Sequence, residues 1–452
     1  MLQVENKTKI NSKQIPAKSI FYNLKSDYFF FIVFNSLQQK KSLEIIKYNN
    51  IFKKKLNLTI KDYKEYSEKY SLIEIEIKPI KGKYGTFINI KSEAKNYFHI
   101  YFNDDKTEIK RNYLCEDDKA TKIKIIIDYQ IISFKELFYY CNCIESIYFK
   151  KFYRTNINNM SYMFFGCSFL KEMNLSNFKT TNVTDMNRMF GDCSLLKKID
   201  LSNFNNNNLI NLESIFYRCS SLKEINLSNF KTINVTNMSK IFYGCSSLQE
   251  INLSDLDTNK VTDIRYMFYY CSKLEEINLS NFNTNNVTNM SHMFESCYSL
   301  KEINLSSFIT VNVENMNEMF SGCSSLKELN LSNFYTNNVK DMSGIFSGCS
   351  SLEEINLSNF NTDEVIYMNN MFNGCSGLKE INLSNFNTRN VTDMHNMFYE
   401  CSSLKKIYIS NFIIKNETDV SDMFFGCSDE IKKKMGTQIK HLKEEVFDGW
   451  VI

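Results

Sequence analysis

Three residue types are scarce in this sequence, and no charge of one sign dominates it. The 452 residues contain two prolines, four histidines and one tryptophan. The shortage of proline excludes a proline-rich spacer between independent modules, and the shortage of histidine leaves little material for acid–base or metal chemistry. Because 54 Lys and Arg face 51 Asp and Glu, the net charge of +3 lacks the basic excess of a dedicated nucleic-acid-binding protein. We therefore expect no nucleic-acid partner.

The sequence also lacks a long apolar run. Its most apolar stretch, Tyr28–Phe34, has seven residues, whereas a membrane-spanning helix needs about 20. The first residues are polar and include the acid Glu5, unlike the basic and then apolar start of a secretory signal. These features predict a cytoplasmic or nuclear protein with neither a signal peptide nor a transmembrane segment.

Cysteine, in contrast, is abundant and regularly spaced. Twelve of the fourteen cysteines recur every 26 residues from Cys141 to Cys427 without an insertion, and only Cys115 and Cys143 stand outside this series. A fixed period of this length indicates a solenoid. One cysteine per repeat does not supply the converging ligands of a zinc site, and identical neighbours have no unique disulfide pairing. We therefore expect a column of reduced, buried thiols.

Each repeat changes from a helical to an extended pattern. The second half predicts a strand that enters a turn, and Thr284 before the first half is expected to cap a short helix. Both sets of apolar residues are expected to form the core, the methionines included. The residues of one repeat are, in the helical half, Val287, Met290, Met293, Phe294 and Cys297, and in the extended half, Leu300, Ile303, Leu305 and Phe308.

These repeats resemble leucine-rich repeats of the BspA-like type, which have 26-residue units. The motif N-V-T-x-M-x-x-M-F-x-x-C-S-S-L-K-E-I-N-L-S-N-F is matched closely from Asn182 to Phe412. The resemblance implies an α/β fold: a right-handed leucine-rich-repeat solenoid with a parallel sheet on the concave face and short helices on the convex face. Because bacterial members of the family are secreted adhesins, it also implies a surface adhesin as an alternative function.

The chain divides into four predicted parts, of which the first two form a small α+β domain. Apolar residues at helical spacing, Ile439, Leu442, Val446 and Trp450, suggest a helix that closes the last repeat. The parts are a helical segment at 1–70, a small β-rich segment at 71–121, a solenoid of about twelve units at 122–427 and a capping helix at 428–452.

Part of the first segment resembles an F-box, the helical module that joins substrate receptors to a ubiquitin ligase. The resemblance rests on Phe34-Asn35-Ser36-Leu37, followed by Leu43 and Ile46 and then by a repeat domain. It implies that residues 20–66 bind a Skp-type adaptor. A substrate receptor of a ubiquitin ligase is therefore a second alternative function.

Two outward-facing positions of each predicted strand repeat as Glu and Asn, and we take them as the candidate binding surface. One interpretation is purely structural: the amides bond from repeat to repeat, and flanking lysines offset the acids. The other is an acidic concave face that receives a cationic partner. The candidate residues are Glu224, Asn226, Glu250, Asn252, Glu276, Asn278, Glu302, Asn304, Glu328, Asn330, Glu354 and Asn356.

Catalytic motifs are missing from the sequence. It contains neither a glycine-rich phosphate loop nor G-x-S-x-G, and no histidine is expected to pair with a neighbouring acid. We expect His292 and His395 to be ordinary surface residues. The sequence thus predicts a non-enzymatic protein–protein interaction scaffold, with no catalytic residue, cofactor or metal site.

Overall fold

The computed structural model describes residues 60–438, and the chain divides into two units between Ser71 and Leu72. The described part of the first unit is the helix α5 (Ile60–Tyr70). The F-box-like motif and the predicted helical residues from Ile439 to Trp450 lie outside the described residues. Within residues 60–438, no helix is both long enough and apolar enough to cross a bilayer.

The second unit begins with a five-stranded sheet in the order β3-β5-β1-β6-β7. The first three pairings are antiparallel, whereas β6 and β7 are parallel. Strand β1 thus covers the edge of the first coil, which would otherwise be open to pairing. The sheet contains residues on both sides of the predicted boundary at 121/122. Its strands are β1 (Ile73–Pro79), β3 (Phe98–Phe102), β5 (Ile123–Ile127), β6 (Ile144–Lys151) and β7 (Glu172–Asn174), and beside it lie β2 (Gly85–Thr86), β4 (Tyr113–Leu114) and the 3-10 helix η1 (Ser92–Tyr97).

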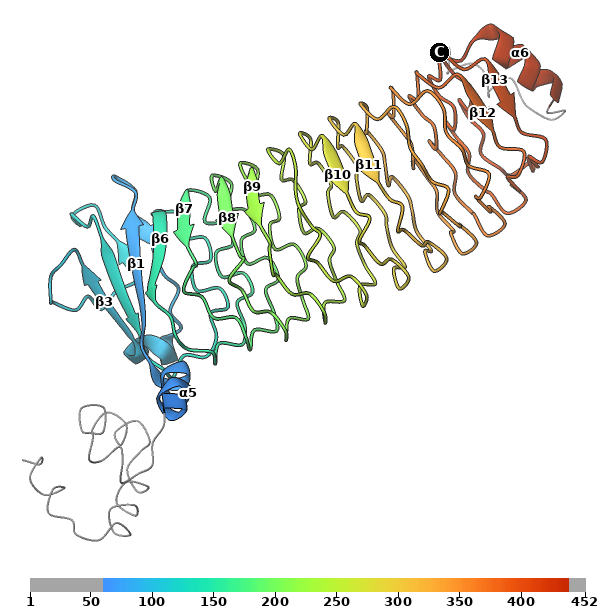
Figure 1. The fold of residues 1–452 in the computed structure, drawn as a ribbon. Helices are drawn as coiled ribbons and strands as arrows, with labels where there is room; N and C mark the ends of the chain where they lie inside the picture. Colours follow the sequence, from blue (N-terminus) through green and yellow to red (C-terminus); the bar gives the residue numbers. More distant parts are fainter. Residues whose placement is uncertain (1–59, 439–452) are drawn as a thin grey trace, which may run out of the picture. The chain divides into compact units, whose positions relative to one another are not determined.

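From β6 onward the chain forms stacked coils of 26 residues (Figure 1). Neighbouring strands are parallel and in register, so that Glu276 lies opposite Glu302, and Asn278 opposite Asn304. A second ladder of single bridges connects equivalent residues of successive coils. The predicted solenoid with parallel strands is therefore confirmed. The short strands after β7 are β8 (Lys198–Asp200), β9 (Glu224–Asn226), β10 (Glu276–Asn278), β11 (Glu302–Asn304), β12 (Glu380–Asn382) and β13 (Lys406–Tyr408).

The predicted short helices were wrong: consecutive tight turns take their place in the described coils. In one coil the Cys297 N–H donates to the Phe294 carbonyl three residues back, while the Phe294 N–H donates to Met319 of the next coil, at 2.8 Å. His292 and Ser296 have φ angles of 57° and 62°. A left-handed residue at every fourth position ends any right-handed helix. The apolar residues recur every three or four positions because turns, rather than helical winding, return them to the core.

The core consists of columns of equivalent side chains. The Phe294 ring stacks on Phe268 and Phe320, with centroid distances of 5.4 and 5.7 Å. The Cys297 thiol is buried and lies 3.2 Å from the Phe268 carbonyl, to which it donates. Of the fourteen cysteines, thirteen are buried, all are free, and only Cys115 is partly exposed. The predicted column of buried, reduced thiols is confirmed.

A buried threonine in most coils bonds to the next coil rather than capping a helix. The Thr284 hydroxyl donates to the Ile309 carbonyl and accepts the Ile309 N–H, both at 2.8 Å. The expected capping role of Thr284 is thus wrong, since there is no helix to cap. Asn206 occupies this position in one coil; it is fully buried, and neither its Oδ1 nor its Nδ2 has a partner among the described residues.

A helix covers the last coil. Helix α6 (Asp429–Gln438) is drawn at the end of the array in Figure 1. Its side chains Ile431 and Met435 are fully buried against the core. The core would otherwise be exposed there, as it is at the open end of any solenoid.

Candidate binding surfaces

The structure brings the predicted Glu and Asn residues together on one face of the coils, here called the sheet face. In the strands with the sequence Glu-Ile-Asn, the isoleucine turns toward the core while the Glu before it and the Asn after it are exposed, as with Glu302, Ile303 and Asn304. All twelve candidate residues are exposed in this way. The register of the parallel strands stacks each type of side chain on its equivalent 26 residues away.

A hollow of about 1080 Å³ lies on the sheet face, between β8 and β11. Its lining includes Glu224, Glu250, Glu276 and Glu302 together with the asparagines that follow them. Lys198 and Lys223 are the basic residues of the lining and lie at its β8–β9 end. The remainder of the hollow is therefore acidic.

Three lysines near this face, Lys171, Lys301 and Lys379, pair with acids that do not belong to the stack. Lys301 lies 2.7 Å from Glu275, and Lys379 pairs in the same way with Glu353. Lys198 and Lys406, in contrast, pair with the stacked Glu224 and Glu380, at 2.6 and 3.2 Å. Five consecutive members of the stack form no ion pair with any residue in the described range. These unpaired glutamates are Glu250, Glu276, Glu302, Glu328 and Glu354.

The stacked asparagines have a local structural role. The Asn304 Oδ1 accepts the backbone N–H of Ser306 at 3.1 Å, and Asn278 bonds Ser280 in the same way at 3.0 Å. The expected amide bonds from repeat to repeat are not formed at these positions. Other asparagines form them, for example Asn286, whose Nδ2 donates to the Asn259 carbonyl at 2.8 Å. Turn formation thus explains the asparagine stack, whereas no ion pair among the described residues explains the five unpaired glutamates.

The sequence analysis missed a cluster of aromatic and arginine side chains on the turns, here called the aromatic patch. Tyr243 stacks between Tyr217 and Tyr269, with centroid distances of 4.8 and 4.5 Å. The Arg188 guanidinium lies 5.7 Å from the rings of both Tyr162 and Tyr217. Burial, together with the nearby Glu295 carboxylate, raises the pKa of Tyr269 to about 12. The 26-residue spacing of Tyr217, Tyr243 and Tyr269 was the available signal.

Each histidine in the described range lies beside a carboxylate, contrary to expectation. His99 Nδ1 is 3.0 Å from Glu108, His395 Nδ1 is 2.7 Å from Asp393, and His292 contacts Glu295. Among residues 60–438, only the group around His395 brings three potential metal ligands within 4.8 Å of one another.

In-register 26-residue coils, capped at both ends and held by a continuous core, define a repeat solenoid with very little helix. The chain belongs to the DUF285 family, described as a Mycoplasma protein of unknown function, which it matches over residues 132–251, 218–334 and 315–437. No curated protein matches it.

Two solved structures are similar to this chain at low identity. One is a leucine-rich repeat protein from Eubacterium ventriosum, with 16% identity, a TM-score of 0.29, and coverage of 63% of this chain and 90% of the other. The second is the TLR13–ssRNA13 complex, with 12% identity, a TM-score of 0.18, and coverage of 56% and 50%. At these TM-scores neither similarity transfers a function to this chain.

Proposed function

We propose that the protein is a non-enzymatic interaction scaffold, built from BspA-like leucine-rich repeats, whose sheet face binds a cationic segment of a partner protein. The observation that carries the proposal is the stack of five exposed glutamates without ion-pair partners in the described range, from Glu250 to Glu354. Three of them, Glu250, Glu276 and Glu302, line the hollow.

The energetics of the stack favour a cationic ligand. In-register strands hold equivalent carboxylates about 5 Å apart, at which distance each neighbouring pair repels by about 1 kcal/mol in water. A Lys or Arg side chain placed between two carboxylates removes this repulsion and forms charge-assisted hydrogen bonds with both. The Nδ2 groups of Asn278 and Asn304 have no partner among the described residues, so they can donate to the backbone carbonyls of the same ligand.

A charge-matched pair of variants tests the proposal. The probe is a fluorescein-labelled decapeptide of alternating Lys and Ser, and fluorescence anisotropy measures its binding to the full chain. Replacing three stacked glutamates with Gln (E276Q, E302Q and E328Q together) should weaken binding at least tenfold and flatten its salt dependence. The control replaces three exposed acids elsewhere on the coils, Glu314, Glu364 and Glu417, and should change binding less than twofold. Equal weakening in both variants, or no binding to the unaltered protein, would reject the sheet face as the site.

The two alternative functions remain proposals that rest on resemblance. The F-box-like residues lie mostly outside the described range, and a purified Skp-type adaptor that co-elutes with the full chain would favour the ubiquitin-ligase receptor. Retention of the full chain on intact cells, in contrast, would favour the BspA-like adhesin. In either case, the glutamate variants show whether the sheet face is the surface used.

A further inference from the structure

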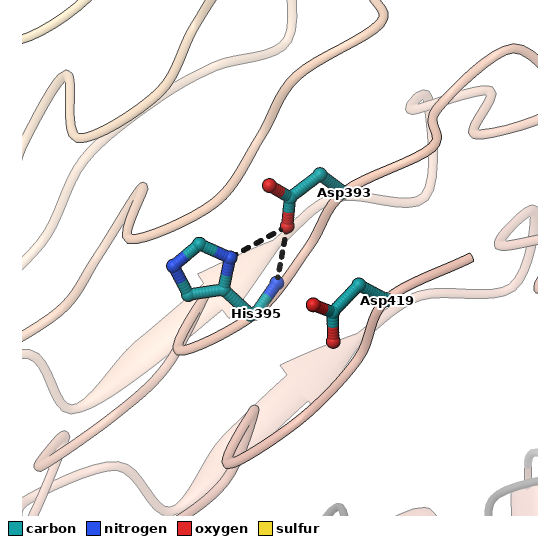
Figure 2. A group of neighbouring side chains, drawn as sticks. All are labelled: Asp393, His395 and Asp419. Atoms are coloured by element: carbon teal, nitrogen blue, oxygen red, sulfur yellow. Dashed lines mark hydrogen bonds and ion pairs between the residues drawn. The ribbon is translucent and has the colours of Figure 1, made fainter.

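Three potential metal ligands converge near the end of the array (Figure 2). Asp393 and His395 belong to one coil, and Asp419 is the equivalent of Asp393 on the next coil, to which a single bridge joins it. One atom from each side chain lies within 4.8 Å of the others. The His395 Nδ1 is 2.7 Å from the Asp393 Oδ1.

This group departs from the repeat pattern at two positions at once. Along the ladder of single bridges, every other aspartate has only Asn or Tyr neighbours; only Asp393 and Asp419 are adjacent. Two residues after the ladder position, the other coils carry Lys, Ser, Asn, Glu or Arg, and only this coil carries a histidine. The two carboxylates, Asp393 and Asp419, are in register and repel each other, and His395 lies beside them.

Both carboxylates retain a free oxygen. The Asp393 Oδ1 accepts the ring and the backbone N–H of His395, and the Asp419 Oδ1 accepts the Ser421 hydroxyl at 2.7 Å and the Ser421 backbone N–H at 3.0 Å. Neither Oδ2 has a hydrogen-bond partner in the described range. Asp419 is also exposed, so water can complete a coordination shell.

We propose that Asp393, His395 and Asp419 bind one divalent first-row transition-metal ion. Two carboxylates and one imidazole suit this class of cation better than Mg²⁺ or Ca²⁺, which prefer oxygen ligands alone. The ion takes His395 Nδ1 as its ligand in place of the hydrogen bond to Asp393, and the ring proton moves to Nε2. The Asn370 Nδ2 lies 3.3 Å from Nε2, and the Asn370 Oδ1 accepts the Asn373 Nδ2 at 2.9 Å. Rotation of both amides together presents the Asn370 oxygen to the ring proton and keeps the hydrogen bond between the two asparagines.

The competing explanation is that a protonated His395 simply balances the two carboxylates. It predicts no metal binding, whereas the proposal predicts one ion per chain that joins two coils. Mn²⁺ is the appropriate probe because thiolates select softer ions, so the fourteen cysteines compete little for it.

The experiment titrates the full-length protein with Mn²⁺ and measures the free ion from its solution EPR spectrum. The unaltered protein should bind one Mn²⁺ at submillimolar concentration. The variants D419N and H395S should each weaken binding at least tenfold; both introduce residues that other coils carry at these positions, so the fold is retained. The control D341N removes a ladder aspartate whose neighbours are Asn315 and Tyr367, and should leave binding unchanged. No loss of free Mn²⁺ with the unaltered protein at millimolar concentrations, or equal binding by D419N and D341N, would overturn the proposal.

Discussion

Replacing Asn206 with Thr should stabilise the coil that contains it. In five other coils the threonine at this position forms two hydrogen bonds to the next coil, as Thr336 does with the Asn361 carbonyl at 2.6 Å and the Asn361 N–H at 2.9 Å. Asn206 is fully buried and forms neither bond. Each recovered hydrogen bond contributes about 1 kcal/mol, so N206T should gain about 2 kcal/mol. Since 1.4 kcal/mol corresponds to a factor of ten, local opening should become about 30-fold rarer.

Hydrogen exchange followed by mass spectrometry is the suitable assay, because coils of a solenoid open locally rather than all at once. Peptides that cover residues 205–232 should exchange about 30-fold more slowly in N206T. The reciprocal variant T336N should speed exchange at residues 336–361 by a similar factor. If N206T exchanges at the original rate while T336N does exchange faster, then the Asn206 side chain is satisfied in solution by a group not seen here, and the reasoning fails.

Two further predictions concern buried titratable groups. Burial raises the pKa of the cysteine thiols in the column, to about 12 for Cys297, and keeps them from reagents. The native protein should therefore react with a thiol reagent at about one site, Cys115, and the denatured protein at all fourteen cysteines. Fast reaction of several thiols in the native state would contradict their assignment to the core. Burial also raises the pKa of Glu318, so the folded protein binds the proton of this carboxyl more tightly than the unfolded chain does. The stability that results is present at low pH and is lost as the pH rises through the raised pKa. E318Q should therefore unfold at higher urea concentration than the unaltered protein at pH 7 but not at pH 4, and a gain of equal size at both pH values would show that the charge is irrelevant.

The repeat period predicted the solenoid, the core positions and the outward-facing residues correctly, because each depends only on which residues recur. The helices were predicted wrongly for a definite reason. Val287, Met290, Met293 and Phe294 follow the spacing of a helical face, and a run of three-residue turns produces the same spacing. Backbone angles distinguish the two. Glycine occupies some of the left-handed positions, such as Gly322 and Gly348, but other coils place residues such as His292 and Ser296 there, so the sequence marks these positions only in part.

The chemistry of the surfaces was less predictable than the fold. The stacked asparagines and glutamates look equivalent in the sequence, and only the hydrogen bond from Ser306 to Asn304 shows that one stack is needed for a turn. His395 was expected to be an ordinary surface residue. It pairs with Asp393 of its own coil, and the approach of Asp419 to this pair depends on the register between two coils. Composition does not reveal a single site of this kind within an array of similar repeats.

The regular coil-to-coil bonding also means that the length of the solenoid can change in steps of one coil. Main-chain hydrogen bonds, ring stacks and thiol contacts all join residues one period apart. Removing or adding one whole period would therefore bring equivalent residues into the same contacts again. Without residues 287–312, for example, Glu276 would lie opposite Glu328 as it now lies opposite Glu302. The length of the acidic stack can therefore change in steps of one carboxylate while the cross-section stays constant. A gene with such near-identical units can lengthen or shorten its product by recombination alone, without redesigning the fold.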